Sequence, residues 1–127
     1  MLPTNFPIPD DLLELTRLLI EVRKRPGTEA RYKAYPAMLQ RFRDLLANCD
    51  DPAVLRQVIA LDSGYYLLAA YRQQVLEKLL AQQRSADVLR AYALQLELFG
   101  DVDEFGEANT DVDDRIEALL READELD

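Results

Sequence analysis

The sequence predicts an all-α fold of about six helices, arranged as three antiparallel helical hairpins. Hydrophobic residues make up 49% of the 127 residues, Leu and Ala dominate them, and there are only 4 Gly. Apolar residues also recur at intervals of three and four, which places them on one face of a helix. Leu, Ala, Glu, Gln and Arg are the residues that lose least on entering a helix. No segment gives a convincing strand, and the length fits a single helical domain over residues 1–127.

The N-terminal part is expected to hold an extended arm and two helices. Residues 1–9 contain three prolines and should run extended. A first helix should begin at Asp10 or Asp11 and stop at Pro26-Gly27. A second should follow Thr28, with a kink or break near Tyr35 because Pro36 removes a backbone donor.

The remaining helices are marked by their start and stop signals. Asp51-Pro52 combines an N-cap acid with proline at the first helical position. A fourth helix is expected over residues 65–83, and a fifth between Ser85 and Gly100. Residues 100–110 form an acidic loop, and residues 111–127 form an acidic C-terminal helix, for which Thr110 and Asp113 have capping-box spacing.

A three-residue sequence occurs twice in the middle of the chain. The triplet at residues 54–56, Val-Leu-Arg, recurs at residues 88–90 just inside another helix start. Asp51-Pro52-Ala53-Val54-Leu55-Arg56 resembles the opening of a HEAT-type repeat, and helical hairpins of this length resemble the units of α-solenoids such as the HEAT and tetratricopeptide families. The tetratricopeptide pattern itself is not met, because no aligned Gly and Ala positions recur and there is no Trp. The resemblance implies a solenoid-like stack whose concave surface binds a partner segment, and a compact helical bundle is the alternative.

Charge is distributed unevenly along the chain. The formal net charge is −9, but residues 97–127 hold 13 acids and 2 bases, while residues 1–96 are nearly neutral. Direct nucleic-acid binding needs clustered Lys and Arg, and an anionic membrane surface needs the same, so neither is expected. A protein partner with a basic patch fits this charge, as does self-association through an apolar stripe or mimicry of a nucleic acid by an ordered row of acids. The other interpretation is that the acids keep a small protein in solution.

Several features favour a cytoplasmic protein. Cys49 is the only cysteine, so no internal disulfide can form. The N-terminus lacks a basic region followed by an apolar one, and is therefore not a secretory signal. The longest apolar run covers residues 65–71, far short of the ~20 residues that span a bilayer. Arg outnumbers Lys twelve to three, a usage typical of bacteria with GC-rich genomes.

The sequence offers little catalytic chemistry, and we expect neither an enzyme nor a cofactor. The chain has no histidine, which removes the usual base near neutral pH and the commonest metal ligand. Cys49 has Asp50 and Asp51 beside it, which oppose formation of a thiolate.

The alternative is a calcium- or magnesium-binding protein, or a metal-dependent hydrolase, that uses the acids of residues 101–117. Positions 1, 3, 6 and 9 of an EF-hand loop are matched by Asp101, Asp103, Gly106 and Asn109. The twelfth position, normally a bidentate Glu, is Val112, and Asp113 comes one residue late. Glu104 with Glu107, and Asp114 with Glu117, have spacings that resemble those of all-α nucleotide pyrophosphohydrolases, which bind magnesium.

The function class that the sequence favours is a protein-interaction module: an adaptor, chaperone or regulatory subunit that holds a partner segment on a helical surface. Tyrosine suits interfaces because it offers a rigid face with a polar tip. The candidate partner-binding residues are Tyr32, Tyr35, Tyr65, Tyr66 and Tyr71. This hypothesis predicts an exposed apolar or aromatic patch, whereas the competing interpretation places the tyrosines at boundaries between helices.

Overall fold

The computed structural model describes residues 7–25, 27, 29–62, 69–103 and 107–127, and of Ala30 only the backbone. It confirms the predicted all-α fold with six helices packed in pairs, and it adds a two-stranded sheet that the sequence did not predict. Contacts divide the chain into two compact units, Met1–Leu67 and Leu68–Asp127. The single domain over residues 1–127 therefore stays a prediction. The choice between a solenoid-like stack and a compact helical bundle stays one as well.

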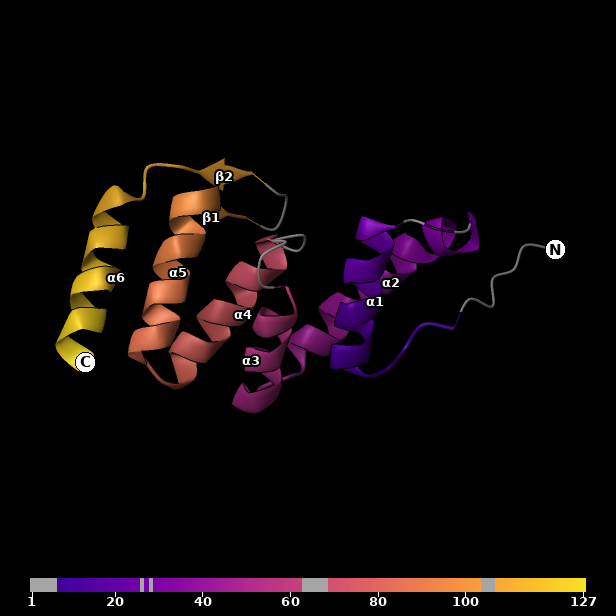
Figure 1. The fold of residues 1–127 in the computed structure, drawn as a ribbon, viewed down its shortest axis with the longest axis horizontal. Coiled ribbons are helices and arrows are strands. Elements are labelled where there is room, and N and C mark those ends of the chain that lie inside the picture. The colour runs from indigo at the N-terminus through magenta and orange to yellow at the C-terminus, as the bar shows by residue number, and fades with distance from the viewer. Residues whose placement is uncertain (1–6, 26, 28, 63–68, 104–106) are drawn as a thin grey trace. The chain divides into compact units, whose positions relative to one another are not determined.

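The first unit packs two helices against a central one. α1 (Leu12–Lys24) contacts both α2 (Glu29–Ala47) and α3 (Pro52–Leu61) (Figure 1). Its fully buried side chains come from all three helices: Leu15, Thr16, Leu19, Met38, Phe42, Leu46 and Leu55. The arm is tied to α2, since the Arg41 guanidinium hydrogen-bonds the Ile8 carbonyl and pairs with Asp10.

Two predicted helix starts in this unit are confirmed, and one expected interruption is wrong in part. The Asp11 carboxylate accepts a hydrogen bond from the Glu14 amide at 3.0 Å, and the Asp51 carboxylate accepts one from the Ala53 amide at 2.9 Å. Pro36 lies inside α2 without breaking it. The helix continues because Met38 and Phe42, just beyond the proline, are fully buried, and their burial offsets the lost backbone hydrogen bond.

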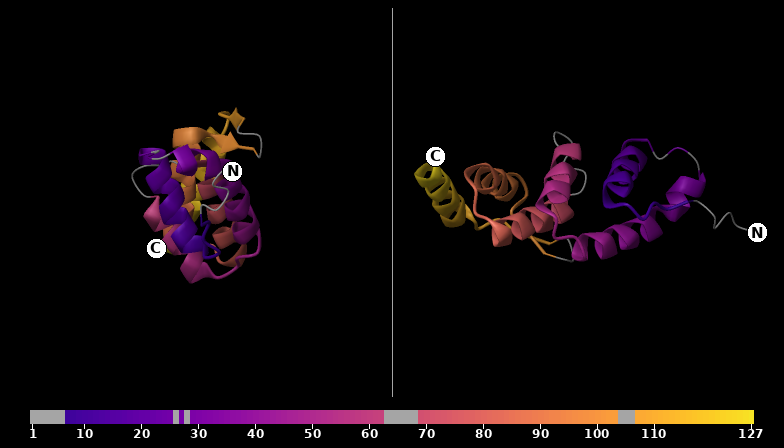
Figure 2. Two further views of the ribbon diagram at one scale, coloured as in Figure 1. Left: turned by 90° about the vertical axis from the view of Figure 1, so that its right-hand side faces the viewer. Right: turned by 90° about the horizontal axis from the view of Figure 1, so that it is seen from below.

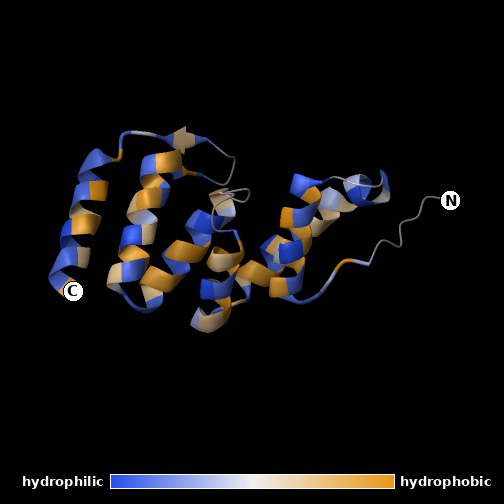
Figure 3. Ribbon diagram, viewed as in Figure 1, coloured by the Kyte–Doolittle hydropathy of each residue, from blue (hydrophilic) through white to orange (hydrophobic). Residues whose placement is uncertain are grey.

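The second unit contains three helices and a small hairpin. α4 (Ala69–Gln82) packs on α5 (Ala86–Phe99), which in turn packs on α6 (Asp113–Leu126). α5 and α6 run antiparallel side by side, joined by the strands β1 (Asp101–Val102) and β2 (Ala108–Asn109) (Figures 1 and 2). Hydrophobic and hydrophilic residues alternate in bands along α6, as an amphipathic helix requires (Figure 3).

Gly100 makes the hairpin possible. It has φ +74° and ψ −170°, a backbone conformation that is essentially restricted to glycine, and it ends α5 as predicted. An added Cβ would lie only 2.6 Å from the Asn109 carbonyl oxygen, so the two strands approach as closely as they do only because residue 100 has no side chain. The expected acidic loop 100–110 is therefore in part an antiparallel ladder, with Asp101 opposite Asn109.

Three further predictions concern helix ends in the second unit. The Thr110–Asp113 capping box is wrong, because α6 begins after Val112 and the Asn109 side chain instead accepts from the Asp111 amide at 3.0 Å. The expected start of the fourth helix lies in residues 63–68, outside the described residues. The predicted hairpin between the third helix, which begins after Asp51, and the fourth, over residues 65–83, crosses the boundary between the units, so its pairing stays a prediction.

A search of the described residues for helices with the length and apolar character needed to cross a bilayer finds none.

Candidate functional site

The α5–α6 pair has two distinct sides. On one side a shallow groove of about 470 Å³ opens between α4 and α6, above α5. Apolar side chains form much of its lining and two arginines lie within it; the lining residues are Glu77, Leu80, Ala81, Arg84, Tyr92, Arg115, Ala118 and Leu119. On the other side lie the exposed leucines described below.

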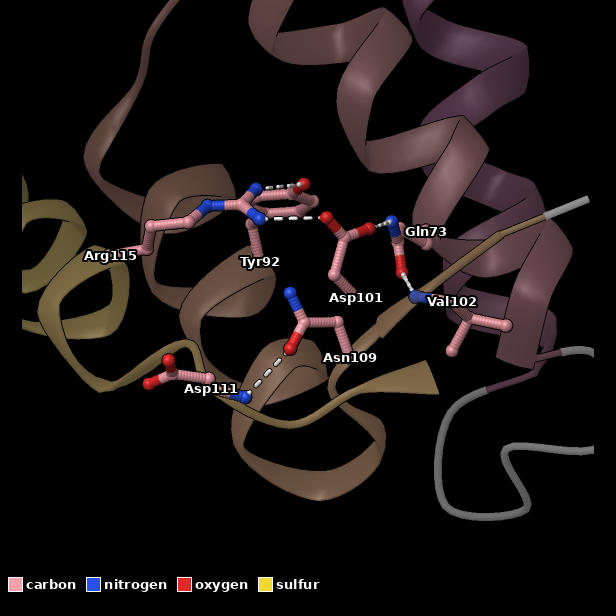
Figure 4. A network of polar contacts seen from close by, with 7 residues as sticks. All are labelled: Gln73, Tyr92, Asp101, Val102, Asn109, Asp111 and Arg115. Atoms are coloured by element: carbon pink, nitrogen blue, oxygen red, sulfur yellow. Dashed lines mark hydrogen bonds and ion pairs between the residues drawn. The ribbon is translucent and has the colours of Figure 1, made fainter. Parts of the chain in front are cut away.

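A buried glutamine on α4 anchors the hairpin beside the groove. Gln73 is 3% exposed, and its side-chain amide donates to the Asp101 carboxylate at 2.7 Å. Its carbonyl oxygen accepts from the Val102 backbone amide at 2.9 Å (Figure 4). One side chain thus satisfies a donor and an acceptor of β1, which fixes the strand against α4.

Arg115, on the first turn of α6, completes this network. Its guanidinium donates to the other Asp101 oxygen at 2.8 Å and to the Tyr92 hydroxyl at 3.0 Å (Figure 4). The hydrogen bonds from Gln73 and then Arg115 hold the pKa of Asp101 below its usual range. Burial raises the pKa of Tyr92, so its hydroxyl stays protonated near neutral pH.

Two more arginines attach the acidic end of α6 to the rest of the unit. Arg84 forms a bidentate pair with Glu122, with nitrogen–oxygen distances of 2.7 and 2.8 Å. Arg90, on α5, donates to Asp124 at 3.1 Å and also pairs with Asp127. Part of the acidic C-terminal quarter therefore neutralises arginines of its own unit.

This polar network has a structural role. Asp101, Gln73, Tyr92 and Arg115 are joined by hydrogen bonds, which connect the hairpin to α4, α5 and α6. Tyr92 is 5% exposed, and Arg115 both donates to its hydroxyl and lies over its ring, with 6.0 Å between Cζ and the ring centroid. The groove thus holds side chains that fix α6 and the hairpin in place.

The exposed side of the α5–α6 pair carries what we call the leucine face, made of Leu94, Leu98 and Leu120. These side chains are 43%, 50% and 41% exposed, respectively. Leu94 lies one turn beyond Arg90 on α5, and Leu120 lies one turn before Asp124 on α6. Because Arg90 bonds Asp124 and the helices are antiparallel, Leu94 and Leu120 follow that pair in the same direction.

The leucine face is distinct from the groove. The α6 residues that line the groove are at positions 115, 118 and 119, and those that flank Leu120 on its own row are Asp113, Glu117 and Asp124. Along α6 these acids and Leu120 have the spacing 4–3–4, which defines one helical stripe. Leu126, at 53% exposed, belongs to the chain end and to another stripe.

The predicted partner-binding tyrosines that the structure describes lie on α2 of the first unit and on α4 of the second. Tyr32 is 70% exposed on α2. Tyr35, half-buried on the same helix, accepts a hydrogen bond from Arg23 at 3.4 Å, and Tyr71 on α4 is half-buried. Tyr65 and Tyr66 lie outside the described residues. Among the three described tyrosines, only Tyr32 is exposed, and the role of all five in binding stays a prediction.

Three of the four candidate metal ligands accept hydrogen bonds from groups of the protein, and the fourth, Asp113, is exposed. The Asp101 carboxylate is bonded to Gln73 and Arg115, and the Asp103 carboxylate accepts from the Glu107 amide at 2.9 Å. Asn109 accepts from the Asp111 amide, and Asp113 is exposed in the first turn of α6. Within the described ranges no three acidic or sulfur-bearing side chains cluster as a metal site would require, whereas Glu104 and Gly106 fall outside those ranges.

The structure also brings out residues that the sequence did not single out. The leucine face was missed because the apolar stripe over Val88, Tyr92, Leu96 and Phe99 drew attention to the packed side of α5. The available signal was a second spacing, Leu94 to Leu98, about 100° or more from that stripe. Gln73 and Arg115 gave no signal, because their partners depend on tertiary contacts.

No protein-family model matches the chain, and comparisons with curated proteins and with solved structures likewise find no match.

Proposed function

We propose that the protein is a non-enzymatic interaction module of the cytoplasm, an adaptor, chaperone or regulatory subunit that holds a helical partner segment on the leucine face. One observation carries the proposal. Of the five large apolar side chains that are exposed among the described residues, four are leucines and all four lie on α5 and α6. Exposed leucines gathered on one helix pair are a feature of docking surfaces rather than of an inert surface.

The polar groups of the same unit support a scaffold rather than a reaction centre. Arg84, Arg90 and Arg115 are used to hold α6 and the hairpin. A rigid pair of helices can present a recognition surface with little loss of entropy on binding. The divalent-metal alternative has less support, because the Asp101 carboxylate already accepts from Gln73 and Arg115, and the Asp103 carboxylate accepts from the Glu107 amide.

Site-specific photo-crosslinking in the native cell tests the proposal. A photoreactive phenylalanine analogue is placed at position 98 or position 120 of the full chain, and at position 32 as an exposed control on α2. We expect positions 98 and 120 to crosslink the same protein, because a helix bound to the leucine face lies within reach of both.

The control decides what the crosslinks mean. Position 32 is more exposed than either leucine, so non-specific collisions would label it at least as strongly. Equal labelling from all three positions, or no crosslinked partner from positions 98 and 120, would contradict the proposed function.

A further inference from the structure

We infer that the segment bound by the leucine face is a basic amphipathic helix, with an apolar stripe flanked by Lys or Arg. This inference rests on the proposed function and adds the chemistry of the partner. It follows from the charges that border the leucine face, most of which form no ion pair among the described residues, and from what they would do to a second copy of the chain.

Acidic side chains surround the leucines on both helices. On α6, Asp113, Glu117 and Asp124 share the stripe of Leu120, and all three are exposed. On α5, Glu97 is exposed and lies one turn beyond Leu94, next to Leu98. A helix that covers the leucines must therefore place its flanking residues next to carboxylates.

These carboxylates are largely not neutralised within the chain. Glu97, Asp113 and Glu117 form no ion pair in the part of the chain that the structure describes. Two cations lie near this border: Arg90, which is shared between Asp124 and Asp127, and the exposed Arg121, one turn beyond Glu117 on α6. The border of the leucine face thus keeps a negative charge that a basic partner would complement.

The same charge disfavours a second copy of this chain as the occupant. In a symmetric dimer the leucine face of one protomer would cover the leucine face of the other. The acids of the two borders would then meet, and juxtaposed like charges oppose association. A helix carrying Lys or Arg on its flanks removes this repulsion, whereas a purely apolar helix would leave the carboxylates beside uncharged surface.

The test uses two synthetic peptides and the full chain. Both are 18-residue helical peptides with Leu at positions i, i+3 and i+7; one carries Lys at the flanking positions and the other Glu. Fluorescence anisotropy is measured at low and high salt. We expect the Lys peptide to bind roughly tenfold or more tightly than the Glu peptide, and to lose affinity as salt screens the acids.

Two pairs of variants separate the apolar from the charged contribution. Leu94→Gln with Leu98→Gln should abolish binding of the Lys peptide, whereas Leu126→Gln, which alters an exposed leucine on another stripe of α6, should leave it unchanged. Glu97→Gln with Glu117→Gln should weaken binding about three- to tenfold and reduce its salt dependence. The control Glu125→Gln removes an exposed charge from α6 on another stripe and should change affinity less than about twofold.

Each outcome bears on a different claim. Equal affinity for the two peptides, or no loss in the Glu97/Glu117 variant, overturns the basic partner while leaving the leucine face as a docking surface. Failure of both peptides together with failed crosslinking overturns the proposed function as well. Concentration-dependent dimers that disappear in the Leu94/Leu98 variant would identify a second copy as the occupant and also overturn the inference.

Discussion

The two units of the chain have similar helical content but use charge and apolar surface differently. Residues 1–67 hold nine acids and nine bases, whereas residues 68–127 hold fifteen acids and six bases, so the whole formal charge of −9 belongs to the second unit. Among the described residues of the first unit, Tyr32 is the one large apolar side chain that is exposed, while the second unit exposes four leucines.

Within the second unit, only part of the acidic residues lies beside the exposed leucines. Arginines on α5, on α6 and just before α5 form ion pairs with several acids, and these pairs hold α6 in place. The acids that remain border the leucine face. A charge count alone therefore overstates how much of the acidic quarter is available to a partner, and the position of each acid on its helix decides it.

The largest effect should come from the glycine that ends α5. Gly100→Ala should lower the free energy of unfolding by about 2–4 kcal/mol, because residue 100 has a conformation essentially restricted to glycine and the new Cβ would meet the Asn109 carbonyl at 2.6 Å. Urea denaturation followed by circular dichroism measures the change, and amide exchange in α6 should accelerate.

Gly27 in the first unit is the matched control. It also has a positive φ, +68°, but a Cβ there would meet only ordinary contacts, the nearest being Arg31 Cδ at 3.4 Å. Gly27→Ala should therefore cost only about 1 kcal/mol. If the two variants lose the same stability, the close approach of the hairpin strands to Gly100 does not exist in solution.

Buried polar side chains provide the second contrast between the units. Gln73→Leu should destabilise the protein by about 1–3 kcal/mol, since the Val102 amide and one Asp101 oxygen lose their partner. In the first unit, Thr16 is fully buried but its hydroxyl bonds only the Leu12 carbonyl of its own helix, at 2.7 Å. Thr16→Val should change stability by less than about 1 kcal/mol, because that carbonyl keeps its backbone partner.

Thermal denaturation of the Gln73 and Thr16 variants compares them under one condition. A Gln73 variant no less stable than the Thr16 variant would mean that β1 is not tied to α4 as Figure 4 shows.

The hairpin should also make the second unit sensitive to acid. The pKa of Asp101 is lowered in the folded state by the hydrogen bonds from Gln73 and Arg115. Its contribution to stability is therefore present above the unfolded pKa of about 3.9, and is lost as pH falls through the lower folded value. Asp101→Asn should reduce stability at neutral pH and flatten its fall below about pH 4.

Urea midpoints at several pH values between 7 and 2 measure the Asp101 effect. Glu125→Gln, which removes a carboxylate of α6 that forms no ion pair among the described residues, is the control. If stability falls with pH in the Asp101 variant as it does in the unsubstituted protein, the hydrogen bonds from Arg115 and Gln73 do not lower the pKa of Asp101 in solution.

The parts of this structure that could be predicted from sequence are those set by local rules. The caps at Asp11 and Asp51 and the glycine stop at Gly100 each depend on residues within one helical turn, and all three are confirmed. Pro36 shows where local rules fail, because tertiary burial of Met38 and Phe42 keeps α2 continuous.

The candidate site was less predictable because it depends on which side of each helix is covered. α5 is apolar around most of its circumference, and only its contacts with α4 and α6 leave Leu94 and Leu98 outside. Likewise, the spacing of Asp101, Asp103 and Asn109 suggested a metal loop, whereas strand pairing and Arg115 direct the same side chains to hydrogen bonds. Long-range partners such as Gln73 and Asp101, 28 residues apart, leave no periodic trace in a sequence.

The smallest effect on stability should come from the leucine face itself. Leu94→Gln with Leu98→Gln should change the free energy of unfolding by no more than about 0.5 kcal/mol per residue, since both side chains are close to half exposed and glutamine has a similar helix propensity. Leu96→Gln, which alters a side chain 1% exposed on the same helix, should instead destabilise the unit by several kcal/mol. Thermal denaturation of the two variants separates a surface from a core. A large loss of stability in the Leu94/Leu98 variant would mean that these leucines are packed against the protein itself in solution. The second unit would then expose no more apolar surface on α5 than the first unit does on its helices, and the difference between the units would disappear.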